Sequence, residues 1–177
     1  MYYRADRSDD HGLRGSWPMT ISEITPDVDR ARWLADADFA DAFRITVEAP
    51  ALDARMAAER MLGQAPAWMA ALVKLRNLLV RPFGLKTSGA DAQNPRPMIG
   101  MFPVVDETPQ RIVLGFDDMH LDFRVVIDAA SHGKTSQVTA TTLVQTHNAL
   151  GRIYLTIIMP FHRLVAKTML RQVAASA

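Results

Sequence analysis

The chain has 177 residues, the size of one ordinary domain and enough to bury a sizeable apolar core. Its 20 lysine and arginine residues nearly balance its 19 aspartate and glutamate residues, so the whole protein has little electrostatic attraction for nucleic acid or a membrane surface. It contains no cysteine. This excludes disulfides, thiolate nucleophiles and cysteine-ligated metals, and it fits a cytoplasmic location.

We expect a polar N-terminal tail at residues 1–14 and a single domain at residues 15–177. The tail is charged and lacks the apolar core of roughly 7 to 15 residues that a signal peptide needs. Charge is uneven along the chain: residues 149–177 contain four bases and no acid, whereas residues 1–60 contain 12 acids and 8 bases. We therefore expect the two ends of the chain to attract each other.

The N-terminal half of the chain predicts a helix, a strand and then a pair of helices. A cap, a proline and an acid at residues 25–27 predict a helix that runs to about Ala37. Apolar and polar residues alternate at 43–47, which predicts a strand. Residues 53–62 are rich in helix formers and end before a glycine, and Pro66 begins a second helix that reaches Val80 or Arg81.

The next part of the chain predicts a loop followed by a set of strands. Residues 86–97 are dense in glycine, serine, asparagine and proline and show no periodicity, so they predict a loop. Strand patterns with short connections then follow at residues 99–105, 110–116, 120–129 and 136–146. Short connections between strands are typical of an antiparallel meander.

The last segment, residues 150–173, is the longest lightly interrupted apolar stretch and predicts a long helix with Asn148 as its N-cap. Pro160 predicts a bend within it. Its unbroken apolar run stops at His162 and Arg163, short of the roughly 20 residues that a membrane span needs. Counting about 100° per residue, we expect one apolar arc to face the sheet, made of Leu150, Tyr154, Ile157, Ile158, Phe161, Leu164 and Val165.

These elements predict an α+β fold. A long amphipathic helix that follows a run of strands usually lies across a curved sheet and helps to enclose a pocket. The sequence therefore predicts a cavity between the sheet and the C-terminal helix.

Arg76 is the first residue whose placement bears on function. It falls among the apolar residues of the helix expected at 66–81. One interpretation is a structural ion pair, or a side chain whose stem reaches the edge of the helix. The other is a fixed cation in a pocket, suited to a carboxylate, phosphate or enolate oxygen of a ligand.

The strand expected at 120–128 has one apolar and one charged face, with His120, Asp122 and Arg124 on the charged face. A polar outer face of an antiparallel sheet explains this pattern. The alternative is that Asp122 orients the imidazole of His120 for proton transfer. His162 likewise has two interpretations, a half-buried hydrogen-bonded imidazole or a catalytic one.

The sequence offers no metal site and no cofactor site. The histidines do not show the paired spacing of a helical zinc motif, and the nine glycines are scattered. Nucleophile elbows, phosphate-binding glycine loops and dinucleotide fingerprints are absent from the sequence. We expect no metal and no cofactor.

Several short stretches resemble the START-like, or SRPBCC, helix-grip superfamily, and more closely a bacterial branch of it known only as a domain of unknown function. They occur in the right order between about residue 20 and residue 172, at 38–43, 66–68, 75–78, 83–86, 120–124, 147–154 and 160–163.

The resemblance implies a strongly bent antiparallel sheet that grips the C-terminal helix around a hydrophobic cavity. Members of the superfamily bind lipids, sterols, polyketides or plant hormones, and some are cyclases or hydrolases. Related domains joined to a nicotinamide-binding oxidoreductase domain imply an oxidoreductase partner. The helix-grip pattern has six or seven strands where the sequence predicts five, so either residues 13–24 supply one more or the superfamily placement is wrong.

Three hypotheses for function follow. The first is binding of a small hydrophobic or amphipathic molecule, including an anionic one, in a cavity lined by Trp68, Leu72, Arg76, Phe102, Phe116, Phe123, Tyr154, Ile158 and Phe161. The second is an enzyme of the cyclase, dehydratase or hydrolase kind that uses Arg76 to hold an anion and His120 with Asp122 as an acid–base pair. The third is a protein-interaction module that docks through the last helix or through the loop from Lys86.

Overall fold

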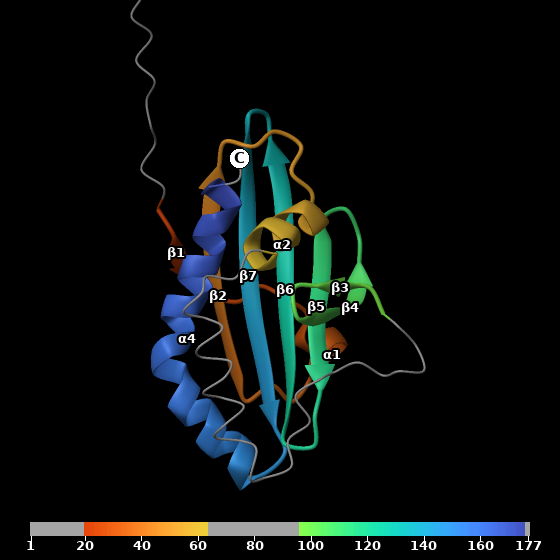
Figure 1. Cartoon of the computed structure of the whole chain (residues 1–177), viewed down its shortest axis with the longest axis vertical. Helices are drawn as coiled ribbons and strands as arrows, with labels where there is room; N and C mark the ends of the chain where they lie inside the picture. The colour runs from red at the N-terminus through yellow and green to blue at the C-terminus, as the bar shows by residue number, and fades with distance from the viewer. Residues whose placement is uncertain (1–19, 64–95, 176–177) are drawn as a thin grey trace, which may run out of the picture.

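A computed structural model describes residues 20–63 and 96–175 of the chain. Within these ranges, seven strands form one antiparallel sheet in the order β1-β2-β7-β6-β5-β4-β3 (Figure 1). The strands are β1 Ser22–Ile24, β2 Phe39–Val47, β3 Met98–Ile99, β4 Phe102–Glu107, β5 Arg111–Asp117, β6 Leu121–His132 and β7 Thr135–Thr146. The helices are α1 Arg30–Trp33, α2 Ala54–Leu62 and α4 Ala149–Ala175. The predicted α+β class is confirmed.

All five predicted strands are present, and two short ones were missed. β1 falls within residues 13–24, the segment named as the source of a further strand, and it pairs with β2. β3 has only two residues, too few to show any periodicity.

The helix predicted from residues 25–27 to Ala37 is wrong, because α1 is a single turn at Arg30–Trp33 capped by Asp29. β1 and β2 are neighbours in the sheet, yet the chain between them runs across the face away from α4 as far as β4, and most of this connection is not helical. Leu34 is buried, and Arg32 forms an ion pair with Asp106 across this face at 3.4 Å.

The helix predicted at 53–62 and the C-terminal helix are both confirmed, with their caps. The Asp53 carboxylate accepts a hydrogen bond from the Met56 N–H at 2.7 Å, and the Asn148 side chain accepts one from the Gly151 N–H at 3.1 Å. The helix expected at 66–81 and most of the loop expected at 86–97 lie outside the described residues.

The core lies between the sheet and the two longer helices, which cover one face of the sheet (Figure 1). Alternate residues of each strand point toward the helices. The last turns of α4 complete the core with Ala166, Met169, Leu170 and Val173. Full burial of a Leu or Val side chain contributes about 1.5–3 kcal/mol to the free energy of unfolding.

The apolar arc predicted to face the sheet is wrong for much of its length. Ile157, Phe161 and Leu164 are 51%, 52% and 58% exposed, together with Ile153 at 57%. The helix is apolar almost all round in this half, so an angular count cannot tell which of its apolar sides is buried. The sheet instead receives the side of α4 that carries Met169 and Val173.

The expected attraction between the two ends of the chain is seen in one ion pair. Arg163 of α4 lies 3.2 Å from the Glu23 carboxylate of β1. Both side chains are largely exposed, so the pair contributes little to stability.

By length and composition alone, α4 is long and apolar enough to cross a membrane. Its most apolar 18 residues have a mean hydropathy of 1.2, and 11% of that window is buried. A single helix of this kind is weak evidence, because the core helix of a globular domain passes the same test. The prediction that this segment does not span a bilayer stays a prediction.

Two leucines of α4 test which side of the helix is packed. Leu170 is fully buried, so Leu170→Ala should lower the free energy of unfolding by about 3 kcal/mol. Leu164→Ala makes the same change at an exposed position and should cost less than about 1 kcal/mol. Urea denaturation measures both. Equal losses from the two variants would contradict the observed orientation of α4.

Candidate functional site

Three phenylalanines form a cluster on the helix-facing side of the sheet, which we call the aromatic patch: Phe102 of β4, Phe116 of β5 and Phe123 of β6. The ring of Phe123 lies 5.5 Å from that of Phe102 and 5.6 Å from that of Phe116, and the Phe102 and Phe116 rings are stacked at 6.5 Å. All three side chains are only partly buried. The sequence predicted that all three residues line a cavity; the structure places them side by side, and the cavity itself stays a prediction.

Among the described helices, none is centred over the aromatic patch. α4 packs mainly on β2 and β7. α2 packs on β5 and β6, but it begins at the far end of β5 from Phe116, where the Ala54 N–H donates to the Pro109 carbonyl at 2.9 Å. The helix-facing side of the sheet is therefore closely packed at one end and carries partly exposed aromatic rings at the other.

The other residues predicted to line a cavity have different positions. Tyr154 and Ile158 are half-buried on the first half of α4. Phe161 is 52% exposed, so its predicted place in a cavity wall is wrong for the reason given above for α4. Trp68, Leu72 and Arg76 lie outside the described residues.

His162 and Asp41 form a pair between α4 and the sheet that the sequence did not predict. The imidazole Nε2 lies 3.0 and 3.1 Å from the two carboxylate oxygens, and the two side chains are only 17% and 8% exposed. The ring of Phe39 meets that of His162 edge to face at 5.7 Å. The half-buried, hydrogen-bonded imidazole, one of the two interpretations of His162, is therefore observed, and a catalytic role stays a prediction. Asp41 was missed because β2 begins at Phe39, four residues before the predicted strand.

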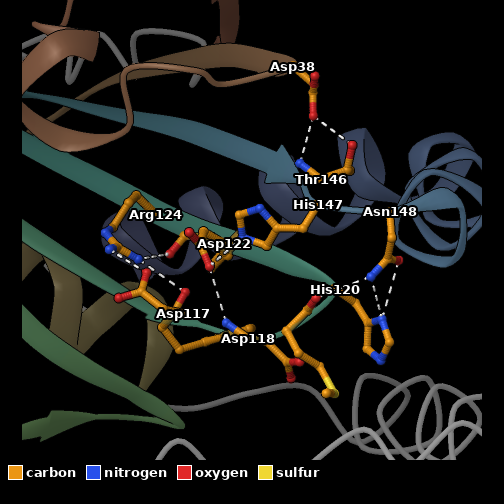
Figure 2. A network of polar contacts seen from close by, with 12 residues as sticks. Asp38, Asp117, Asp118, His120, Asp122, Arg124, Thr146, His147 and Asn148 are labelled. Atoms are coloured by element: carbon orange, nitrogen blue, oxygen red, sulfur yellow. Dashed lines mark hydrogen bonds and ion pairs between the residues drawn. The ribbon is translucent and has the colours of Figure 1, made fainter.

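A second histidine–aspartate pair lies at the start of α4 (Figure 2). His147 Nε2 is 3.1 Å from the Asp122 carboxylate, which also accepts a hydrogen bond from the Asp118 N–H at 3.2 Å. Neither side chain of the pair is fully buried. The carboxylate thus ties the end of β7 to the turn before β6.

The predicted pair of His120 and Asp122 is not brought together. Nδ1 of His120 lies 2.9 Å from the side-chain nitrogen of Asn148, while Asp122 binds His147 (Figure 2). The physical reason is that β6 begins at Leu121, so His120 belongs to the preceding turn and not to the alternation of the strand. Nε2 of His120 is buried and has no partner among the described residues.

Arg124 has a structural role beside this network. Its guanidinium donates to the carbonyls of Phe116 and Phe123, both at 3.0 Å, and pairs with Asp117 at 2.6 Å. It crosses Gly115, where a Cβ atom would lie 2.1 Å from the Phe123 carbonyl oxygen. Only glycine at position 115 therefore lets the Arg124 side chain lie flat across β5 next to the Phe123 carbonyl.

The first turn of α4 is fastened to the turn between β5 and β6. The His147 N–H donates to the His120 carbonyl at 2.9 Å, and the Asn148 side chain donates to the Met119 carbonyl at 3.1 Å. A Cβ on Gly151 would lie 2.2 Å from the His120 carbonyl oxygen, so only glycine allows this approach.

Metal binding finds no support in the described geometry. Within residues 20–63 and 96–175, no three histidine, aspartate or glutamate side chains are grouped as metal ligands. The two histidine–aspartate pairs are suited to hydrogen bonding and proton transfer instead.

Comparison with known proteins places the chain in a family. Residues 33–169 match the family model described as "Protein of unknown function (DUF2867)". The chain belongs to the DUF2867 family. The expected assignment to a domain of unknown function is confirmed, and the wider START-like placement stays a prediction.

Two further comparisons describe this DUF2867 protein. No curated protein matches it. It is similar to a solved structure described as "conserved protein from Geobacillus kaustophilus", at 10% identity and a TM-score of 0.41, covering 78% of this chain and 94% of that one.

The contact between Asp38 and Thr146, at the end of β7, should depend on pH. The carboxylate of Asp38 accepts hydrogen bonds from the hydroxyl and the backbone N–H of Thr146, both at 2.6 Å (Figure 2). These two bonds lower the pKa of Asp38 below its ordinary value of 3.8. Stability from this group is therefore present above about pH 4 and is lost as the pH falls through the lower folded-state pKa.

Asp38→Asn should lower the free energy of unfolding at neutral pH by less than about 1 kcal/mol, because the carboxylate is largely exposed to water. The difference from the parent protein should shrink below about pH 4, as measured by urea denaturation across pH. Asp36→Asn is the control, since Asp36 is exposed and has no hydrogen bond among the described contacts. A loss for Asp38→Asn that does not change with pH would contradict this account.

Proposed function

We propose that this DUF2867 protein binds a small hydrophobic or amphipathic molecule in a cavity on the helix-facing side of the sheet, with the aromatic patch as its floor and α4 at its side. The observation that carries the proposal is the patch itself, three phenylalanine rings in contact and partly exposed on the helix-facing side of the sheet. Apolar walls with few polar groups are typical of sites for such molecules.

The shape of the core supports this proposal. At the end of the sheet near α2, the side chains of Ile112 and Ile127 are fully buried, so that end is filled by the protein's own side chains. At the aromatic patch, part of each ring stays accessible. A bound apolar molecule would remove this area from water, which contributes roughly 25 cal/mol for each Å² buried. The role of Arg76 as the holder of an anionic group stays a prediction.

Binding can be measured with defined probes. Octanoate, decanoate and phenylacetate should raise the thermal unfolding midpoint, and decanoate should displace anilinonaphthalene sulfonate from the protein. The double variant Phe116→Leu/Phe123→Leu keeps an apolar surface but removes two rings, and it should weaken decanoate binding about tenfold. Phe161→Leu removes a ring on the exposed side of α4 and serves as the matched control.

Two results would overturn the proposal. One is the absence of any midpoint shift with all three acids. The other is an equal loss of affinity in Phe161→Leu and in the double variant, since binding would then lie on the outer side of α4.

An enzyme of the cyclase, dehydratase or hydrolase kind is the second candidate, and the pair of His162 and Asp41 favours it. An imidazole held by a buried carboxylate is suited to general acid–base work. This pair takes the place of His120 and Asp122, which the structure separates. Mass spectrometry of a bound compound after incubation distinguishes the candidates: an unchanged mass supports binding alone, and a new product that is lost in His162→Gln supports an enzyme.

A protein-interaction role is the third candidate, favoured by the exposed apolar side of α4 at Ile153, Ile157, Phe161 and Leu164. An oxidoreductase partner is implied by the family resemblance alone. A cytoplasmic location is supported by the absence of cysteine.

A further inference from the structure

A pocket of about 680 Å³ lies on the face of the sheet away from α4. Its floor is formed by β2, β7, β6 and β5, and its walls include Ile24 and Asp27 on one side and the loop of Ala51, Leu52 and Asp53 on another. Ala51 has a φ of 57°, a left-handed conformation that costs a non-glycine residue on the order of 1 kcal/mol. This pocket shares no wall with the aromatic patch.

A continuous row of polar residues crosses the floor, which we call the polar row. The strand register places Arg44 opposite Thr139, Thr139 opposite Asp128, and Asp128 opposite Arg111. Directly opposed residues on antiparallel strands point to the same face. Four neighbouring strands therefore contribute one polar side chain each at the same level of the sheet.

The acidic groups around the pocket are already engaged. Asp128 binds Arg111 through two bonds of 2.6 and 3.2 Å. Asp53 caps α2. The pKa of Arg111 is raised first by its bond to Asp128, and the charge of Asp27 adds to this effect. Asp128 and Asp53 thus have hydrogen-bond partners within the protein, whereas Asp27 interacts with Arg111 through its charge alone.

Arg44 is different, because its charge has no acidic partner among the described residues. Its Nε donates to the Thr139 hydroxyl at 3.0 Å, which fixes the plane of the guanidinium. The side chain is partly buried. The two terminal nitrogens form the free end of a fork whose geometry matches a carboxylate.

A second unsatisfied group lies in the same floor. Thr141 is 1% exposed, and its hydroxyl has no hydrogen-bond partner among the described residues. It lies two residues after Thr139 on β7 and therefore points to the same face. A buried hydroxyl without a partner is costly in a folded protein, so its presence in a pocket indicates a missing polar partner.

We propose that this pocket binds a small monocarboxylate, with the carboxylate on the terminal nitrogens of Arg44 and a hydroxyl or carbonyl oxygen of the ligand near Thr141. A dianion such as phosphate fits less well, because Arg44 is the one uncommitted cation in the described lining and three carboxylates line the same pocket. The volume suits a metabolite-sized molecule. The site is independent of the function proposed for the opposite face of the sheet.

The test is an NMR titration of the full ¹⁵N-labelled chain with acetate, lactate and gluconate, and separately with glucose and inorganic phosphate. We expect saturable shifts at the backbone amides of Arg44, Thr139 and Thr141 with at least one monocarboxylate. Glucose carries similar hydroxyls to gluconate without the carboxylate and should cause no such shifts.

Variants then assign the binding to particular groups. Arg44→Gln should weaken the affinity at least tenfold, and Arg44→Lys should also weaken it, because an ammonium lacks the fork. Arg152→Gln removes an equal charge from an exposed position on α4 and should leave the affinity unchanged. Thr141→Val should raise the thermal midpoint and reduce the affinity, so it separates binding from folding if the Arg44 variants fold poorly.

Three outcomes would overturn the inference. They are the absence of saturable shifts at these amides with every monocarboxylate, tight binding of phosphate with no response to carboxylates, and affinity unchanged in the folded Arg44 and Thr141 variants.

Discussion

The pairing of β6 with β7 is the constraint on which the rest of the structure depends. These two strands have twelve residues each and pair without interruption from Leu121 with Thr146 to His132 with Thr135. Because side chains alternate between the two faces, this register decides which residues meet the helices and which meet the opposite face. A slip of one residue would exchange the two sets.

The register of β6 with β7 places the residues of both proposed sites. Phe123 of β6 points to the helix-facing side and belongs to the aromatic patch, whereas Asp128 of the same strand points away and belongs to the polar row. The two surfaces therefore share a backbone but differ in chemistry. One presents aromatic carbon, and the other presents a guanidinium held in place by a threonine.

The strands could be predicted because alternation is a local property of the chain. Within β6 the alternation was assigned correctly, since Val125 and Ile127 belong to the core beneath the helices and Asp128 lines the pocket on the opposite face. The N-cap at Asn148 could also be predicted, because a helix N-cap needs only a short polar side chain just before the apolar helical segment. These features depend on residues that are near neighbours in sequence.

The rest depends on contacts between distant residues. His162 and Asp41 are 121 positions apart, and no local pattern links them. The exposed side of α4 was misassigned because several of its sides are apolar, and only the position of the sheet selects among them. The predicted pairing of His120 with Asp122 is wrong because β6 begins one residue later than predicted, at Leu121. The ends of a strand are harder to predict from sequence than its middle.

The fastening of α4 at two separated places has a mechanical consequence. Its first turn is held by Gly151 and Asn148 against the β5–β6 turn, and its last turns are held by Leu170 and Val173 in the core. Between them, Pro160 removes the hydrogen bond that the Thr156 carbonyl would otherwise accept. The pair of His162 and Asp41 holds the helix to β2 just after this missing bond. The stretch of α4 between Gly151 and Pro160, where no side chain is fully buried and Ile153 and Ile157 are exposed, is therefore held to the sheet less firmly than the segments on either side of it.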